Sequence, residues 1–196
     1  MTAFGQKRTC MYDEQTLLKI GAREPLSATS EDECREAVAR FSSAIDTHPD
    51  LRSLIDMGSY DSFVSVFVYS PSEAIRIGTE NGEVRVRYDG QLLFFHKFAP
   101  VVALGKGGWG ESLQPDGTWS SRGYDQLDLE DLLTLEQIMP DLRRSRIARA
   151  LENTSFALLS PAYLMQSAPS EFEPDDRSIG NTPWDRLFHV YFQFCD

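Results

Sequence analysis

The sequence predicts a single α+β domain built around an antiparallel sheet, and three patterns support this. Residues 61–104 hold consecutive apolar segments separated by turn dipeptides, which is typical of a β-meander. Apolar residues at helical spacing come before this region and return after it. The chain then ends in an alternating apolar run, which predicts a strand that rejoins the sheet. We expect about five strands, packed by N-terminal and mid-chain helices.

A chain of 196 residues is long enough for one domain with a sizeable core. Within this domain the sequence divides into six parts of different character. They are a helical part at 1–60, the meander at 61–104, a Gly/Trp-rich loop at 105–124, a second helical part at 125–166, an acidic loop at 167–183 and the C-terminal strand at 184–196.

Three helices are expected before the sheet. Residues 13–20 carry a short apolar stripe, which Gly21 ends. Ser30 and Glu33 have the spacing of a capping box, and apolar residues then recur at helical spacing as far as residue 46. Residues 50–57 predict a further short helix.

The turn dipeptides predict the register of the meander. Asn81-Gly82 is a strong two-residue hairpin signal, and as a turn it pairs Ile77 with Val86. Asp89-Gly90 predicts a second hairpin of the same kind. The expected strands are therefore 62–69, 74–78, 83–88, 91–98 and, from the end of the chain, 186–195.

The same register gathers three arginines on the reverse face of the meander. It sets Arg76 opposite Arg87, and Arg85 shares their face. Opposed arginines are unfavourable unless an anionic or aromatic group covers them. The cover is either a set of carboxylates from a helix of this chain or an external anion. In the second case Arg76, Arg85 and Arg87 form an anion-binding site.

Glycine and tryptophan dominate residues 105–124. These glycines do not predict a phosphate-binding loop, because no Gly-Lys-Ser/Thr follows at the required spacing. Pro115-Asp116-Gly117 is a turn signal that predicts a small hairpin projecting Trp109 and Trp119. Long loops of this kind are often functional, so we expect a working surface here. The alternative is that both tryptophans fold back onto the core.

Helical patterns return after this loop. Asp128 and Thr134 are candidate caps of a first helix, and Pro140 suits the first turn of a second helix. Residues 156–159 are a short apolar run of undetermined type. Ser160-Pro161 predicts the start of another short helix.

Several kinds of site lack their sequence pattern. His48, His96 and His189 do not show the close spacing of metal ligands. Three scattered cysteines argue against structural zinc and against a disulfide framework. No nucleophile motif is present. We therefore assign no catalytic residue, no metal ligand and no cofactor.

Charge and hydropathy limit the partners and the compartment. The formal net charge is −11, and most of the excess acid follows residue 104. Such a surface repels nucleic-acid phosphates and attracts a basic protein. The sequence has no apolar stretch of about 18 residues and no secretory signal, so we expect a cytoplasmic protein without a membrane span.

Small size, acidic charge and the lack of catalytic motifs give the chain its general character. In this it resembles the immunity proteins that bacteria make against their own secreted toxins. The resemblance rests on no single motif and assigns no residue a role. It implies a non-enzymatic inhibitor that occludes a basic surface of a toxin. The alternatives are a hydrolase-like enzyme whose site only the fold assembles, and an adaptor or regulatory binding protein.

The expected binding surface joins the aromatic loop to the acids that follow it. Large aromatic side chains dominate the binding energy of many interfaces, and acidic side chains attract a cationic partner. The predicted partner-binding residues are Trp109, Glu111, Asp116, Trp119, Tyr124, Asp125, Asp128 and Asp131.

Overall fold

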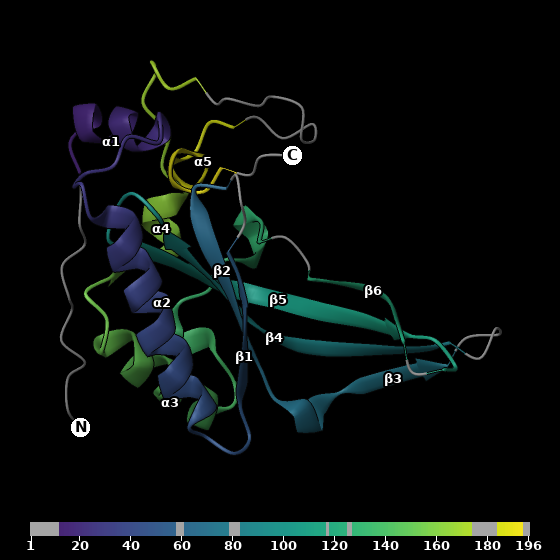
Figure 1. Cartoon of the computed structure of the whole chain (residues 1–196). Coiled ribbons are helices and arrows are strands. Elements are labelled where there is room, and N and C mark those ends of the chain that lie inside the picture. The colour runs from purple at the N-terminus through teal and green to yellow at the C-terminus, as the bar shows by residue number, and fades with distance from the viewer. Residues whose placement is uncertain are drawn as a thin grey trace.

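The computed structural model describes residues 12–57, 61–78, 83–116, 118–124, 127–173 and 184–193. Helices surround a mixed, curled sheet, which confirms the α+β class (Figure 1). Five strands follow the order β1-β2-β4-β5-β6, while β3 pairs with β4 and β7 pairs with β5. Their bounds are Arg52–Asp56 (β1), Phe63–Tyr69 (β2), Ile75–Gly78 (β3), Val84–His96 (β4), Val101–Leu113 (β5), Trp119–Tyr124 (β6) and Ala157–Leu158 (β7). Because β7 runs parallel to β5, the sheet is not the purely antiparallel meander that the sequence predicts.

The helices cover both faces of the sheet. They are α1 (Glu14–Gly21), α2 (Ser30–Asp46), α3 (Asp141–Glu152), α4 (Pro161–Leu164) and α5 (Leu187–Tyr191), with 3-10 turns η1 (Pro71–Glu73), η2 (Leu129–Asp131) and η3 (Leu135–Gln137). The predicted helices at 13–20 and 30–46 are confirmed as α1 and α2, and those beginning near residues 140 and 161 as α3 and α4. The predicted capping box is wrong, because the Ser30 hydroxyl accepts a hydrogen bond from the backbone N–H of Ser27.

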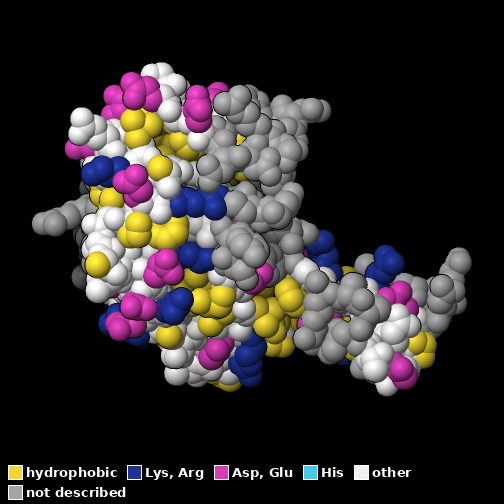
Figure 2. Space-filling model, turned by 45° about the horizontal axis from the view of Figure 1, so that its top comes forward, with side chains coloured by type: hydrophobic (Ala, Val, Ile, Leu, Met, Phe, Trp, Pro, Cys, Tyr) yellow, Lys and Arg dark blue, Asp and Glu magenta, His cyan; other side chains and the backbone are white. Residues whose placement is uncertain are grey.

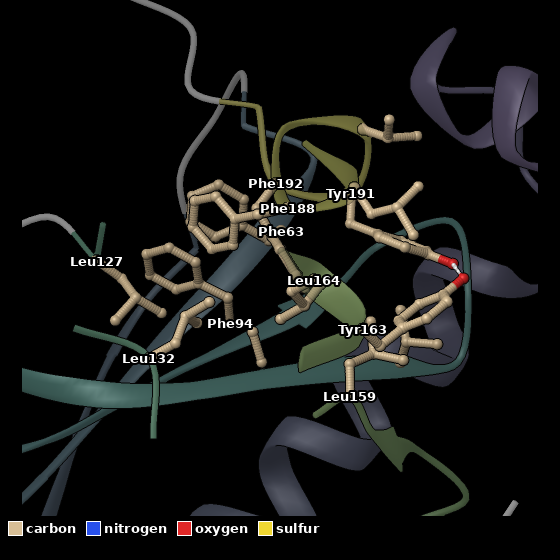
Figure 3. Packing of buried hydrophobic residues seen from close by; sticks show 14 of the residues in the cluster. Phe63, Phe94, Leu127, Leu132, Leu159, Tyr163, Leu164, Phe188, Tyr191 and Phe192 are labelled. Atoms are coloured by element: carbon tan, nitrogen blue, oxygen red, sulfur yellow. Dashed lines mark hydrogen bonds between the residues drawn. The ribbon is translucent and has the colours of Figure 1, made fainter. Parts of the chain in front are cut away.

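Alternation along β2 and β4 divides the buried residues into two clusters. Val64, Val66, Leu93 and Phe95 face α2 and α3, where the ring of Phe41 packs 5.4 Å from that of Phe95. On the opposite face, aromatic side chains from the sheet meet α4 and α5 (Figure 3). There the rings of Phe63 and Phe94 stack 4.0 Å apart, and the hydroxyls of Tyr163 and Tyr191 form a hydrogen bond.

The sheet has two parts because β4 and β5 are long. Each has 13 residues, which corresponds to about 43 Å of extended chain. The second half of β4 and the first half of β5 are buried in the body of the protein. Their other halves join β3 and β6 in an arm that projects from the body (Figure 1). We call residues 75–78, 84–89, 108–113 and 119–124 the arm.

The predicted hairpin at Asp89-Gly90 is wrong, because β4 passes straight through both residues. Gly90 allows close packing here. A Cβ atom at this position would lie 2.3 Å from the carbonyl oxygen of Val68 and 2.9 Å from the ring of Phe67. Glycine therefore lets β2 and the Phe67 ring approach β4 in the middle of a strand.

The antiparallel pairing of β3 with β4 is confirmed, but its predicted register is wrong by one residue. Ile77 pairs with Arg85, and Ile75 pairs with Arg87. The Asn81-Gly82 turn lies outside the described residues. A shift of one residue moves every side chain of one strand to the other face, so the predicted grouping of arginines changes with it.

Three further segments differ from their predicted structure. Residues 52–56 form the edge strand β1 where a helix is predicted. Residues 105–113 continue β5 where a loop is predicted, although the predicted hairpin around Pro115-Asp116 is confirmed by the antiparallel pairing of β5 with β6. Residues 187–191 form the short helix α5 in place of the predicted strand. All five of its residues are buried. The alternation in the sequence therefore does not separate a buried face of a strand from an exposed one.

Candidate functional site

Three aromatic side chains lie on one face of the sheet where the arm leaves the body. Tyr69 ends β2, and Tyr88 of β4 pairs directly with Trp109 of β5. The rings of Tyr69 and Tyr88 are 4.8 Å apart, and Phe67 stacks on Tyr69 at 5.6 Å. We call Tyr69, Tyr88 and Trp109 the aromatic shelf. Figure 2 shows hydrophobic side chains gathered at the surface where the arm meets the body.

The shelf is anchored at its inner side and open at its outer side. All three side chains pack against the buried cluster beneath α4 and α5 but remain only partly buried. Two glycines lie beside them, because Tyr69 pairs with Gly90 and Gly90 pairs with Gly107. Neighbouring side chains cover both glycines, because the Phe67 ring lies against Gly90 and the Leu92 side chain lies against Gly107.

Carboxylates influence the shelf. Glu111 lies two residues beyond Trp109, on the same face of β5, and pairs in the register with Arg122. Burial raises the pKa of the Tyr69 hydroxyl above its usual range, and the neighbouring Tyr88 and Glu111 raise it further. Asp46 acts in the same direction, whereas Arg52 opposes it. The shelf therefore combines aromatic rings with nearby charges of both signs, since Arg76 and Arg122 share its face in the register with Glu111.

The structure places the other predicted partner-binding residues at different distances from the shelf. In the register of β6, Tyr124 pairs with Trp109 and Trp119 pairs with Leu113, although their side chains lie outside the described part. Asp116 lies at the turn between β5 and β6, where it accepts hydrogen bonds from the N–H and hydroxyl of Thr118.

The remaining acids belong to the base of the arm. Asp128 accepts a hydrogen bond from the N–H of Leu129 at the start of η2. Asp131 is 3.3 Å from Lys106 in an ion pair that joins η2 to β5. Asp125 lies outside the described residues. Trp109, Glu111 and the backbone position of Tyr124 thus share one sheet face, and Asp128 and Asp131 have local structural partners.

The predicted opposition of Arg76 and Arg87 is wrong, and the three sheet arginines do not form one group. Arg76 pairs with Val86, so it shares the face of the shelf. Arg85 and Arg87 point to the other face, where Arg87 forms an ion pair with Asp89 at 3.1 Å. Since a carboxylate lies beside Arg87 and Arg76 is on the opposite face, the proposed anion-binding trio lacks its expected geometry.

A different arginine is buried against the sheet. Arg143 of α3 is 5% exposed and forms an ion pair with Glu73, the last residue of η1. It also donates to the side-chain oxygen of Gln91 on β4, at 3.4 Å. A helix thus supplies a cation to a carboxylate beside the sheet, the reverse of the predicted arrangement. The pair fastens the turn between β2 and β3 to α3.

The described residues hold no group of three or more His, Cys, Asp or Glu side chains placed to bind a metal ion. Burial raises the pKa of the Cys34 thiol to about 12, so this side chain stays protonated and unreactive. Burial lowers the pKa of His96 to about 3, and its Nδ1 accepts two backbone hydrogen bonds at the turn between β4 and β5. Cys34 and His96 are therefore structural residues of the core.

A concave feature lies away from the shelf, on the body between α1 and α4. It is a hollow of about 330 Å³. Its rim includes Tyr12, Glu14, Tyr163 and Gln166. We regard the shelf as the stronger candidate, because it joins partly exposed aromatic rings from three strands with adjacent charge.

Sequence reasoning finds Trp109 and Glu111 but misses Tyr69 and Tyr88. Both tyrosines occur in apolar strands, so the sequence predicts that they are core residues like their neighbours. The available signal is their position, since each is the last aromatic residue of its apolar run and precedes a turn-forming or charged segment.

No helix within the described part of the chain is long and apolar enough to cross a membrane. Comparison of the chain with protein-family models, with curated proteins and with solved structures gives no match. The candidate site must therefore be interpreted from its own geometry.

Proposed function

We propose that this protein is a non-enzymatic inhibitor of the immunity type, which binds a basic surface of a bacterial toxin and occludes it. The observation that carries the proposal is the aromatic shelf at the root of a projecting arm. Tyr69, Tyr88 and Trp109 are only partly buried, although each also packs on the core.

Such rings are suited to anchor a protein partner. Large aromatic side chains bury much area on binding and lose few rotatable bonds, so they are enriched among residues that dominate binding energy. The ladder of β2, β4 and β5 fixes the backbone beneath all three rings before a partner arrives. A preorganised surface of this kind loses little conformational entropy when it binds.

Charge favours a basic protein as the partner. The chain carries a net charge of −11, so the attraction rests on the charge of the whole chain. On the arm itself Glu111 is negative, with Asp116 at its turn, but four arginines are also present. Aromatic faces of sheets also bind single-stranded nucleic acids, but that mode needs a positively charged groove for the phosphates. An acidic protein repels such a ligand, so the same rings are better matched to a cationic protein surface.

The proposal is tested by neutralisation. If a gene adjacent to that of this protein encodes a toxin, the two products are expressed together in a bacterial host and growth is measured. The wild-type chain should restore growth, and the purified pair should form a complex. Tyr88→Ala and Trp109→Ala should each weaken that complex by about 2 kcal/mol, roughly thirtyfold.

Arg85→Ala is the matched control, because Arg85 lies on the opposite face of the same arm. It should leave both neutralisation and affinity unchanged. Thermal unfolding of each variant shows whether the fold is intact. Normal neutralisation by both folded aromatic variants would exclude the shelf as the inhibitory surface. Turnover of a hydrolase substrate by the purified protein, lost on one point mutation, would favour the enzyme alternative instead.

A further inference from the structure

We propose that the hollow between α1 and α4 binds a small primary amine with an apolar body, its ammonium group beside Glu14 and its body against Leu17 and Tyr163. This site is separate from the aromatic shelf and does not rest on the proposed function. Both helices belong to the body of the protein, away from the arm (Figure 1). The volume of the hollow, the unequal burial of its lining and its one charged side chain support the assignment.

The hollow has room for a ligand of limited size. Its volume of about 330 Å³ lies at the lower end of the range of small-molecule pockets, about 300 to 1,000 Å³. The start of α1 forms one wall, and the segment that follows α4 forms the other. Backbone hydrogen bonds hold this second wall, since Leu187 donates to the carbonyl of Gln166 at 2.9 Å and Ala168 donates to that of Asp185 at 2.8 Å. The walls are therefore in place before a ligand arrives, which lowers the entropic cost of binding.

The buried part of the lining is apolar. It consists of Leu17, Tyr163 and Leu187, which belong to the hydrophobic cluster beneath α4 and α5. The hydroxyl of Tyr163 already has a partner, because it forms a hydrogen bond with the hydroxyl of Tyr191 at 3.1 Å (Figure 3). Tyr12 is partly buried and packs on the same cluster. This part of the hollow therefore suits the hydrocarbon body of a ligand.

The exposed part of the lining is polar. It includes the side chains of Glu14, Gln166, Ser167 and Ser170. Within the described part of the chain, none of these four side chains makes a hydrogen bond or an ion pair. A ligand with one apolar end and one polar end would therefore bind with its polar end outward, where these groups can reach it.

Charge favours an ammonium group at that polar end. Glu14 carries the one formal charge among the residues that line the hollow. Asp13, the N-cap of α1, places a second carboxylate at the same end of the helix. The nearby Arg186 has its own counter-charge, since its Nε is 3.3 Å from the carboxylate of Asp185, and Lys19 lies in the last turn of α1. A cation is therefore attracted to the mouth of the hollow, and an anion is repelled.

The test uses phenethylamine, which joins a primary amine to a single ring. It is titrated into isotopically labelled protein, while NMR follows the backbone amides of Leu17 and Ala168, one in each wall. Both signals should shift to saturation, with a dissociation constant of about 1 mM. 2-Phenylethanol has the same shape without the charge and should bind roughly threefold more weakly. Methylamine has the charge without the body and should produce no saturable shift.

Glu14→Gln removes the carboxylate at an exposed position, so the fold should be preserved. Its affinity for phenethylamine should fall to that for 2-phenylethanol, and its affinity for 2-phenylethanol should equal that of the wild type. Glu24→Gln is the matched control, because it removes the same charge at an exposed position beyond the other end of α1. It should leave the binding of both probes unchanged.

Three outcomes would overturn the inference: no saturable shift of the Leu17 and Ala168 amides, equal binding of phenethylamine and 2-phenylethanol by the wild type, or equal losses of affinity in the two glutamate variants. None of them bears on the inhibitor proposal, which the variants of the aromatic shelf test separately.

Discussion

His96 illustrates how one buried residue couples stability to pH. It is fully buried, and its Nδ1 accepts hydrogen bonds from the N–H groups of Phe98 and Ala99, each at 3.0 Å. An Nδ1 that accepts two hydrogen bonds carries no proton, so the neutral ring is the form that fits the turn between β4 and β5. Protonation would place an uncompensated charge in the core.

The pH dependence follows from the pKa of about 3 in the folded protein, against 6.5 for an unperturbed histidine. Between these values the unfolded chain binds the proton and the folded chain does not. The stabilisation from neutral His96 is therefore complete above pH 6.5 and is lost as the pH falls toward 3. Between pH 6 and 5 the free energy of unfolding should fall by about 1 kcal/mol per pH unit.

Urea unfolding at a series of pH values measures this slope. His96→Gln removes the titrating group, so the slope should become shallower even if overall stability drops. Burial also lowers the pKa of His189, so that residue adds a smaller slope of the same sign in both proteins. An unchanged slope in His96→Gln would show that other groups control the acid response.

The ion pair between Arg143 and Glu73 should respond asymmetrically to substitution. The Arg143 side chain is 6% exposed, whereas that of Glu73 is 49% exposed. Removing Glu73 leaves a buried cation without its counter-charge, while removing Arg143 leaves a carboxylate that water can solvate. Glu73→Gln should therefore cost about 2 kcal/mol or more, and Arg143→Met about 1 kcal/mol or less. Chemical denaturation of both variants checks the order, and a reversed order would show that the buried charge is solvated.

At the scale of elements, the glycines of β5 explain why a segment that predicts a loop forms a strand. A Cβ at Gly105 would lie 2.0 Å from the Leu127 side chain and 2.7 Å from the carbonyl oxygen of Asp131. The backbone of β5 is thus covered by the segment around η2, and Leu133 donates to the carbonyl of Leu104. Glycine is required here for close approach of two backbones.

Gly105→Ala should therefore destabilise the protein by about 1 to 3 kcal/mol, because the added methyl group overpacks this crossing. Gly123→Ala is the matched control in β6, where a Cβ would meet nothing within 4 Å. It should be neutral or slightly stabilising. Thermal unfolding of the two variants gives the comparison, and equal losses would mean that backbone flexibility matters more than the crossing.

The edge strand β1 has a protective contact. Asp46, at the end of α2, accepts a hydrogen bond from the backbone N–H of Ser53 at 2.7 Å and contacts its hydroxyl. An exposed strand edge is a template for pairing with another chain, and a carboxylate bonded to an edge N–H hinders that pairing. The sequence predicts a helix at 50–57 and so does not reveal this contact. A five-residue strand has too few residues to show the two-residue period of a β-strand.

The sequence predicts those elements whose hydrophobic period and end signals agree. Asp13 caps α1 as its side chain suggests, and Ser160 caps α4. Glycine causes the main errors, because Gly90 and Gly105 allow close packing inside strands yet resemble turn and loop residues in sequence. The candidate site is found only in part, since Trp109 is conspicuous but its neighbours Tyr69 and Tyr88 depend on the pairing of three separate strands.

At the scale of the whole molecule, the acidic charge is not concentrated on the arm, which carries Arg76, Arg85, Arg87 and Arg122 against Asp89 and Glu111. Steering by the arm therefore depends on where its acids lie. A partner that approaches the shelf meets Glu111 on the same sheet face and Asp116 at the turn between β5 and β6. Reversing these two charges with Glu111→Lys and Asp116→Lys should slow association with a basic partner by about tenfold at low salt. Dissociation should change less, because steering acts before contact.

Asp32→Lys with Glu36→Lys provides the control, because both side chains are exposed on α2 and the net charge changes equally. Stopped-flow association measured at rising salt separates the two effects. If the arm guides the partner, only the arm reversal slows association strongly, and the difference shrinks as the Debye length falls below about 10 Å. Equal slowing by both pairs would mean that total charge, and not its position on the arm, attracts the partner.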